Sequence, residues 1–362
     1  MNRDDKGLKG IGQLREEIDG IDEKILGLLN KRAKIVIEVG RQKRKKNAEL
    51  YTPSREKEIY SRLERINKGP FPNDSLKVVF REIMSASLAL EGPLKVAYLG
   101  PKATFTHMAC IQQFGFSAAY IPVNSIKDVF SEVERGRAFY GVVPIENSTE
   151  GVVNHTLDMF IESPLKITGE IMLGVSHHLL SKGGSIPDVK QIYSHPHAIA
   201  QCRRWLEENM PDVPVIEVSS TAKAAEICME DPVAAAIASE LAAKLYGLQI
   251  IKKRIEDNIN NSTRFLVISE KSSEKTGRDK TSVMFSVKDR VGALYDILRP
   301  FSENNINLTK IESRPSGKKV WEYIFFVDLE GHIDDKKVNM VLDELKNHTV
   351  FFKVLGSYAK KG

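Results

Sequence analysis

Side chains with hydroxyl and amide groups are concentrated in five short segments between residues 94 and 269. These segments are GPKATFT (100–106), ENSTEG (146–151), SHPHAIAQC (194–202), SSTAKAA (219–225) and NSTRF (261–265). They lie beside short apolar runs that have the composition of β-strands. Because open α/β sheets place ligand-binding groups at strand ends, the segments predict a ligand site built from hydroxyls and amides.

Several other kinds of site lack their characteristic residues. The sequence has no GxGxxG or GxxxxGK[ST] nucleotide fingerprint and no GxSxG turn of a serine hydrolase. His195 and His197 have no third metal ligand nearby, and the three cysteines, Cys110, Cys202 and Cys228, are far apart and odd in number. We therefore expect reduced thiols, no metal and no cofactor.

A second set of candidate residues is charged and lies in the first 92 residues. Arg32 and Lys43 are eleven residues apart, so on one helix they point the same way, ~16 Å apart, and could converge on a small dianion. Arg15 lies ~25 Å from Arg32 along that helix and about 100° around it, so it could reach the same pocket only from another chain. Taken singly, each of these charges is typical of a solvated surface.

Four further polar candidates lie on the two helices expected to follow. They are Arg55 and Glu56, in the first turn of the second helix, and Ser87 and Glu91, which share one face of the third.

Apolar residues at steps of three and four predict a helix over residues 8–46, uninterrupted by proline. It would be roughly 58 Å long, longer than a small domain of 90 residues, so its apolar stripe requires a partner chain. Thr52 and Pro53 predict the start of a second helix that ends near Gly69. A third helix is expected over residues 74–90.

Short apolar runs alternate with helical patterns from Leu94 to Ser269, which is typical of an α/β domain. The polar stretch 270–280 predicts a linker. The rest predicts the βαββαβ order of a ferredoxin-like domain: strand 281–287, helix 291–304, strands 307–313 and 320–328, helix 334–347 and strand 350–355. We therefore expect three domains, over residues 1–92, 93–270 and 281–362.

The chain has 362 residues, 42% of them hydrophobic and 28% charged, and no apolar run approaches the ~20 residues of a membrane helix. The N-terminus has no signal-peptide or transit-peptide pattern, so we expect a soluble, cytoplasmic protein. The net charge is +5, and its densest part is the run 41–46. Such a run is typical of a solvated helix end, although it could also contact an anionic substrate or, less readily, nucleic acid.

The helical segment resembles the all-helical chorismate mutase family. The motifs are LREEIDGIDEKILGLLNKR, EVGRQK, PSREKE and SASLALE, between Leu14 and Glu91. The resemblance implies an intertwined dimer in which Arg15 enters the partner's site. It further implies these roles: Arg15 and Arg32 grip substrate carboxylates, Lys43 and Glu91 face the ether oxygen, Glu56 takes the ring hydroxyl, and Arg55 and Ser87 complete the pocket.

This family's rearrangement of chorismate needs no nucleophile, only the reactive conformer and stabilisation of charge on the ether oxygen. One common form of the motif has glutamine at position 91, whereas Glu91 must be protonated to donate a hydrogen bond. We therefore hypothesise that mutase activity rises toward acid pH.

The middle segment resembles prephenate dehydratase, with Asn261 and the following TRF as the most specific mark. The resemblance implies two α/β lobes, like those of periplasmic binding proteins, around a cleft. It implies that Thr263 donates a proton to the departing ring hydroxyl and that Arg264 fixes a carboxylate. The implied lining residues are Thr104, Asn147, Ser148, Ser194, Gln201, Ser220 and Thr221. Ala103 replaces the usual glycine of the family, which is costly if the loop requires a positive φ.

The last segment resembles the ACT domains attached to prephenate dehydratases, through DRVGAL (289–294) and ESRP (312–315). The resemblance implies that phenylalanine binds between two such domains and inhibits the enzyme. The implied effector residues are Gly292, Ala293, Leu294, Glu312, Ser313, Arg314 and Pro315.

Together the resemblances predict an enzyme that rearranges chorismate to prephenate and converts prephenate to phenylpyruvate, with phenylalanine as allosteric effector. Its partners would be these molecules and further copies of the chain, as a dimer or tetramer, without nucleic acid or membrane. One alternative is a ligand-sensing regulator whose basic helix contacts nucleic acid, although no helix-turn-helix is found. Another keeps the dehydratase and makes the helical segment only a dimerising or regulatory arm.

Overall fold

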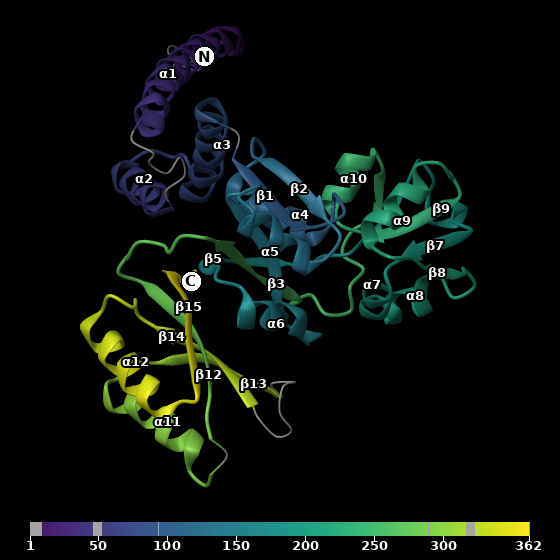
Figure 1. Ribbon diagram of the computed structural model, residues 1–362. Helices are drawn as coiled ribbons and strands as arrows, with labels where there is room; N and C mark the ends of the chain where they lie inside the picture. The colour runs from purple at the N-terminus through teal and green to yellow at the C-terminus, as the bar shows by residue number, and fades with distance from the viewer. Residues whose placement is uncertain (1–8, 46–52, 93, 289, 316–322, 362) are drawn as a thin grey trace, which may run out of the picture. The chain divides into compact units, whose positions relative to one another are not determined.

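The structure is a computed structural model that describes residues 9–45, 53–92, 94–288, 290–315 and 323–361. The chain forms two compact units, one of residues 1–94 with 114–118 and the other of residues 95–113 with 119–362 (Figure 1). Thr52, predicted to cap the second helix, Asp289 of the DRVGAL motif and the start of the strand predicted over 320–328 lie outside the described residues.

The first unit is helical, as predicted. Its helices are α1 (Ile11–Lys45), α2 (Pro53–Ile66) and α3 (Asn73–Glu91). The helices α1 and α3 approach closely at Gly40, where a Cβ atom would lie 2.9 Å from Glu91 Cγ. In the N-terminal half of α1, apolar side chains remain exposed. Each is between 45% and 72% accessible: Ile11, Leu14, Ile18, Ile21, Ile25 and Leu28. This exposed stripe is the one that the sequence assigns to a partner chain.

The first lobe of the second unit is built on a mixed sheet. Its strands are β1 (Lys95–Leu99), β2 (Ala119–Val123), β3 (Tyr140–Asn147), β4 (Gly151–Val152), β5 (Lys166–Gly174) and β11 (Ser262–Ser269), in the order β2-β1-β3-β11-β5, with β4 paired to β3. Its helices are α4 (Phe105–Phe114), α5 (Ile126–Glu134) and α6 (Asn154–Glu162). Strand β11 is antiparallel to both β3 and β5.

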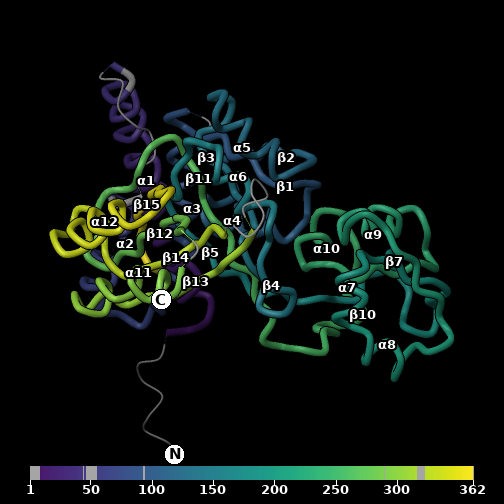
Figure 2. Tube along the Cα trace, turned by 60° about the horizontal axis from the view of Figure 1, so that its bottom comes forward, coloured from purple at the N-terminus to yellow at the C-terminus, as the bar shows by residue number. Residues whose placement is uncertain are grey.

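The second lobe has its own five-stranded sheet. Its strands are β6 (His178–Ser181), β7 (Gln191–Ser194), β8 (Val215–Glu217), β9 (Ala234–Ala238) and β10 (Gln249–Lys252), in the order β10-β6-β9-β7-β8. Its helices are a short 3-10 turn (Ile186–Asp188), α7 (Pro196–Gln201), α8 (Arg203–Asn209), α9 (Thr221–Cys228) and α10 (Glu240–Tyr246). The chain crosses between the lobes after β5 and again before β11 (Figure 2), so the lobes are joined by two segments.

The last part has the predicted ferredoxin-like topology. Its elements are β12 (Asp279–Ser286), α11 (Ala293–Glu303), β13 (Leu308–Pro315), β14 (Tyr323–Glu330), α12 (Lys336–His348) and β15 (Phe351–Ala359), with sheet order β13-β14-β12-β15. Successive side chains of a strand face opposite sides. In β12 and β14, Val283 and Val327 face a core shared with both helices.

The other face of this sheet packs against the first lobe. Met284, Phe326 and Leu355 share one buried core with Ile145 and Phe160 of that lobe. At Gly356 of β15 the contact is so close that a Cβ atom would overlap the carbonyl oxygen of Ile167. The ferredoxin-like domain and the first lobe therefore form a continuous hydrophobic interior.

Candidate active sites

The first site is centred on Thr263, which pairs across the β3–β11 ladder with Asn147. Asn147 Nδ2 lies 2.8 Å from Thr263 Oγ1 and 2.9 Å from Asn261 Oδ1. Asn147 Oδ1 accepts from the backbone N–H groups of Thr149 and Glu150, at 2.9 and 3.0 Å. Because a backbone N–H can only donate, these contacts fix the orientation of the amide. Asn147 thus donates to Thr263, whose own hydroxyl proton is left to donate to a ligand.

Further amides extend this arrangement into the second lobe. Asn261 Nδ2 donates to Gln201 Oε1 at 2.8 Å, and Gln201 Nε2 donates to Glu150 Oε1 at 2.7 Å. We call Asn147, Gln201, Asn261 and Thr263 the amide cluster. It joins β3 and β11 of the first lobe to α7 of the second.

His177 supports the amide cluster from a buried position. Its Nε2 lies 2.8 Å from Gln201 Oε1, which can only accept, so Nε2 carries the proton. Burial lowers the pKa of His177, against the opposing effect of the Gln201 hydrogen bond, and so favours this neutral form. Asn261 and Glu150 belong to segments singled out in the sequence, but His177 does not, because a histidine within an apolar run carries no distinctive signal.

The other predicted prephenate-binding residues lie at strand ends, and one of them, Ser148, reaches the amide cluster, because its Oγ donates to Asn261 Oδ1 at 3.5 Å. Ser148 Oγ accepts from the Ser262 N–H at 2.9 Å. Fully buried Ser194 donates to the Ile237 carbonyl at 2.7 Å. Ser220 caps helix α9, which begins at Thr221, and Thr104 donates to the Pro101 carbonyl at 3.1 Å. Ser194 ends β7 and Ser220 follows the neighbouring parallel strand β8, so they share one sheet edge.

The structure does not support the carboxylate-binding role predicted for Arg264. Its side chain points to the face of β11 opposite Thr263, as strand alternation requires, and is only 6% exposed. The guanidinium contacts Asp328 and Glu170 at 2.7 and 2.9 Å and the Tyr358 hydroxyl at 3.0 Å. Its donors are therefore directed to other protein groups rather than to a substrate.

Ala103, which replaces the glycine usual in the resembling family, has φ 69°, so the loop does require a positive φ. Its N–H donates to His107 Nδ1 at 3.1 Å, and its carbonyl accepts from Ser239 at 3.1 Å. Burial, with a smaller contribution from Lys102, lowers the pKa of His107 to about 4. Because only a neutral imidazole has an acceptor nitrogen, the lowered pKa preserves the hydrogen bond from Ala103 to His107 that holds this loop.

The second site lies in the helical unit, where four of the seven predicted residues meet. Arg32 on α1 donates to Ser87 on α3, and Ser87 donates to the Ile83 carbonyl at 2.6 Å. Lys43 Nζ lies 3.5 Å from Glu91 Oε2, and Glu91 is 6% exposed. Burial lowers the pKa of Arg32, while the nearby Glu91 raises it. Two cations and a carboxylate therefore line the contact between α1 and α3.

The remaining three predicted residues of this site lie on α2 or nearer the start of α1. Glu56 accepts from the Tyr60 hydroxyl at 3.0 Å, and exposed Arg55 pairs with Glu58 at 2.7 Å. Arg15 is exposed on α1.

The predicted effector residues divide between the start of α11 and the edge strand β13. Gly292 has φ 81° and precedes Ala293 and Leu294 in the first turn of α11. Glu312, Ser313, Arg314 and Pro315 end strand β13. Arg314 contacts Asp158 at 2.7 Å and the Asn154 carbonyl at 2.8 Å, both on α6 of the first lobe, and no sequence pattern predicted these partners.

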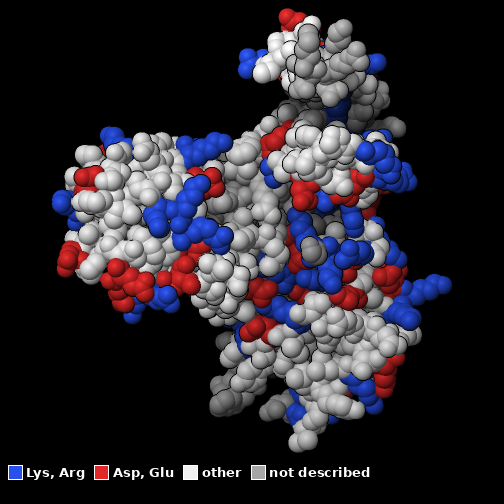
Figure 3. All heavy atoms as spheres, turned by 180° about the vertical axis from the view of Figure 1, so that it is seen from behind, with Lys and Arg blue, Asp and Glu red and all other residues white. Residues whose placement is uncertain are grey.

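Charge and metal-ligand patterns add no further site. On the face shown in Figure 3, basic groups stand beside acidic ones, without an extended area of one sign among the described residues. The described part of the chain contains no cluster of three or more potential metal ligands. Its helices include none with the length and apolar character needed to cross a membrane.

Three family descriptions match successive parts of the chain: chorismate mutase type II over residues 14–92, prephenate dehydratase over 96–273 and the ACT domain over 281–347. A bifunctional chorismate mutase/prephenate dehydratase of Aquifex aeolicus is 56% identical over 98% of this chain and 99% of its own length. The Pseudomonas aeruginosa relative of that description is 45% identical over 96% and 97%. The chain belongs to this bifunctional family.

The bifunctional chorismate mutase/prephenate dehydratases catalyse both steps predicted from the sequence, so the chain is an isomerase and a lyase of phenylalanine biosynthesis. The predicted fold class is confirmed for all three parts. This family membership favours an enzyme over a ligand-sensing regulator, and it assigns the helical segment a catalytic role rather than only that of an arm.

Solved structures cover the dehydratase and ACT parts. A prephenate dehydratase of Arthrobacter aurescens in complex with L-Phe is 37% identical, with a TM-score of 0.68, over 74% of this chain and 90% of that one. A protein described as a quorum-quenching acylase, GqqA, is 30% identical with the same TM-score, over 74% and 98%. Since one fold carries both descriptions, the assignment here rests on the full-length relatives and on the site residues.

Proposed function

We propose that Thr263 is the proton donor of the dehydratase reaction. The observation that carries this proposal is the orientation of Asn147, which donates to Thr263 Oγ1 and leaves the threonine proton for the ligand. As the C–O bond of the ring hydroxyl breaks, this proton would convert the leaving hydroxide to water. The bond between the ring and its carboxylate carbon also breaks and releases CO2. The electron pair of that bond completes the aromatic ring.

The carboxylates of prephenate require a different partner, since Arg264 is directed elsewhere. We infer that hydroxyls and N–H groups at the sheet edges bind them, with Ser148 from the first lobe and Ser220 and Thr221 from the second. The Ser194 hydroxyl is not among them, because it is buried and donates its proton to the Ile237 carbonyl. The first turn of α9 adds the positive end of a helix dipole, which favours an anion. The amide cluster, through Gln201, would keep the two sets of groups at a fixed separation.

For the mutase, we propose that Arg32 binds a carboxylate while Lys43 and a protonated Glu91 stabilise negative charge on the breaking ether bond. Ser87, Arg55 and Glu56 would complete the pocket. Arg15 would come from a second copy of the chain, which would also cover the apolar stripe of α1. The exposure of Ile11, Ile18 and Ile21 supports a dimer of this kind.

We further propose that phenylalanine binds between two ACT domains, at Gly292–Leu294 of one and Glu312–Pro315 of the other. Support comes from the L-Phe in the related Arthrobacter structure and from the position of β13 at a sheet edge, where a second domain can pair. The free, buried thiols Cys110, Cys202 and Cys228 suit a reducing cytoplasm.

One assay tests these proposals together. The purified protein is supplied with chorismate alone, and prephenate and phenylpyruvate are followed in time with and without phenylalanine. Phenylpyruvate formation that phenylalanine suppresses is the expected result. If phenylalanine has no effect while both steps proceed, the effector proposal is wrong; if prephenate accumulates unchanged in both conditions, the dehydratase site is wrong.

A further inference from the structure

The strand pair that carries the amide cluster also carries a second pair of residues on its other face. In the register of β3 and β11, Thr263 lies opposite Asn147 and Arg264 lies opposite Glu146. Adjacent residues of a strand point to opposite faces, so the first pair belongs to the amide cluster and the second faces the ACT sheet. A displacement of either pair along the ladder moves the other, because the two share a continuous backbone.

The Glu146–Arg264 pair belongs to an ion network between the first lobe and the ACT domain. Its members are Glu146, Glu170, Arg264, Lys280, Lys310 and Asp328, which we call the interdomain ion network. Arg264 contacts all three carboxylates, with Glu146 at 3.3 Å, and Lys280 contacts Glu170 at 2.8 Å. Three cations thus balance three carboxylates, as a buried network requires.

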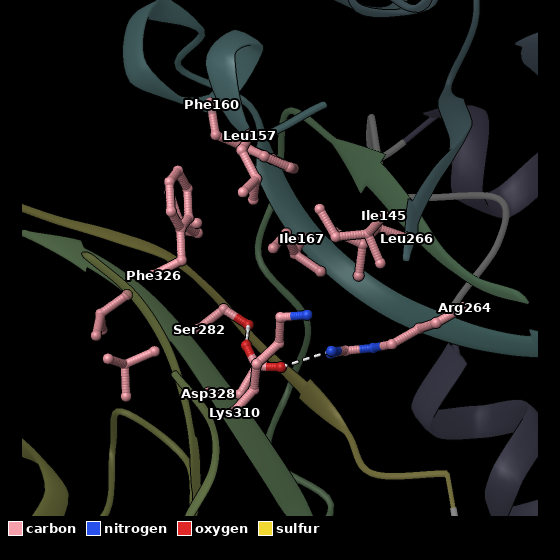
Figure 4. A pocket seen from close by; sticks show the side chains of 13 residues that line it. Ile145, Leu157, Phe160, Ile167, Arg264, Leu266, Ser282, Lys310, Phe326 and Asp328 are labelled. Atoms are coloured by element: carbon pink, nitrogen blue, oxygen red, sulfur yellow. Dashed lines mark hydrogen bonds and ion pairs between the residues drawn. The ribbon is translucent and has the colours of Figure 1, made fainter. Parts of the chain in front are cut away.

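Figure 4 shows Arg264, Lys310 and Asp328 directed toward one another beside a small cavity. The cavity has a volume of about 20 Å³ and is otherwise lined mainly by apolar side chains. It is too small for an organic substrate, so the polar groups around it serve one another. Removing one member would leave its partners with uncompensated charge in an apolar setting.

Lys310 is the member that connects the effector strand to the active-site ladder. It lies on β13, two residues before Glu312, and its ammonium group contacts the Glu146 carboxylate. Glu146 immediately precedes Asn147, the residue that orients the Thr263 hydroxyl. Lys310 and Arg314 both reach the first lobe from β13, at Glu146 and Asp158 respectively.

We propose that Lys310, a residue of the ACT domain, is a positioning residue for the dehydratase: through Glu146 it holds the ladder in the register that places Asn147 against Thr263. The ACT domain then contributes to turnover in the absence of effector as well as responding to phenylalanine. This inference rests on the proposed role of Thr263. It predicts an effect on kcat rather than on KM, because Lys310 lies on the face away from the substrate groups.

The test uses the full-length protein with Lys310→Met, Lys310→Arg and Glu146→Gln. Lys353→Met is the matched control, since the Lys353 ammonium group also crosses from the ACT domain, but its hydrogen bonds go to the carbonyls of Phe160 and Ser163, which lie outside β3 and β11. For Lys310→Met and Glu146→Gln we expect dehydratase kcat to fall about tenfold with KM changed less than about twofold. Lys310→Arg and Lys353→Met should stay near wild type.

Further measurements separate positioning from damage to the fold. The double variant Lys310→Met/Glu146→Gln should lose no more kcat than the worse single variant, because each single variant already removes the Lys310–Glu146 ion pair. Mutase activity of the same polypeptide and the thermal unfolding temperature report folding. An unchanged kcat in Lys310→Met, or an equal loss in Lys353→Met, would overturn the inference.

A Thr263→Val variant keeps the two proposals distinguishable. If it loses turnover while Lys310→Met does not, only the positioning role fails. If Thr263→Val retains turnover, the proposed proton donor fails, whatever the Lys310 variants do.

Discussion

The amide cluster of the dehydratase and the charged residues of the mutase differ in how much of a site one chain assembles. Thr263, Asn147, Asn261 and Gln201 are already joined by hydrogen bonds within the described chain. In the helical unit Arg32, Lys43, Ser87 and Glu91 meet, but Arg15 remains exposed beside an uncovered apolar stripe. The difference teaches that strand register within one chain assembles the amide cluster, whereas in our proposal a second copy of the chain completes the mutase site.

The largest effect should come from removing the Thr263 hydroxyl. Thr263→Val keeps the shape of the side chain but has no proton to donate, so dehydratase kcat should fall by roughly 10²–10⁴-fold. Turnover of prephenate by purified protein measures it. Thr263→Ser retains a hydroxyl and should keep most activity, while mutase activity of both variants should be unchanged. Equal losses in the valine and serine variants would point to packing rather than to proton donation.

Mixing two inactive mutases tests whether the helical site is shared between chains. Arg15→Ala and Arg32→Ala should each lower mutase activity by about 10²-fold or more, because each removes a charged donor from the substrate. In a mixed dimer, one of the two sites regains both arginines. After subunit exchange of equal amounts, about a quarter of wild-type activity should therefore return. A mixture as inactive as its parents would place Arg15 outside the partner's site.

Acid should destabilise the dehydratase unit through its buried histidines, all of which lie beyond residue 94. The pKa of His107 is about 4 in the folded chain against 6.5 as the ordinary value. Between these values the unfolded chain binds a proton that the folded chain does not, so stability present above pH 6.5 is lost as pH falls. The loss should reach roughly 2–3 kcal/mol by pH 4.

Urea unfolding at pH 7 and pH 4.5 measures this loss. His107→Gln should reduce the pH dependence, and His155→Gln, at an exposed histidine, should leave it as in wild type. If both variants keep the full pH dependence, other groups are responsible.

The smallest effect concerns the pH profile of the mutase. If Glu91 must be protonated to donate to the ether oxygen, mutase kcat/KM should rise several-fold from pH 8 to pH 5. Glu91→Gln, which donates at any pH, should give a flat profile. A flat wild-type profile would contradict the proposed role of Glu91.

The sequence predicted the elements well because their periodicities are strong. The helix expected over 8–46 is α1 (Ile11–Lys45), and all six elements of the ferredoxin-like part are found in order. The orientation of Arg264 follows from a pattern that the sequence already contained: next to Thr263 on a strand, it has to face the other way. Its partner Asp328 lies 64 residues along the chain, and no local pattern brings such residues together.

Because the first lobe and the ACT domain share one hydrophobic core, they cannot be separated into two stable fragments. A chain cut near residue 270 would uncover Ile145 and Phe160 and leave Met284, Phe326 and Leu355 without the atoms that bury them. Neither fragment would then be a self-sufficient product. Recombination could therefore replace the helical segment more easily than the ACT domain, because the ACT domain contributes side chains to the hydrophobic core of the first lobe.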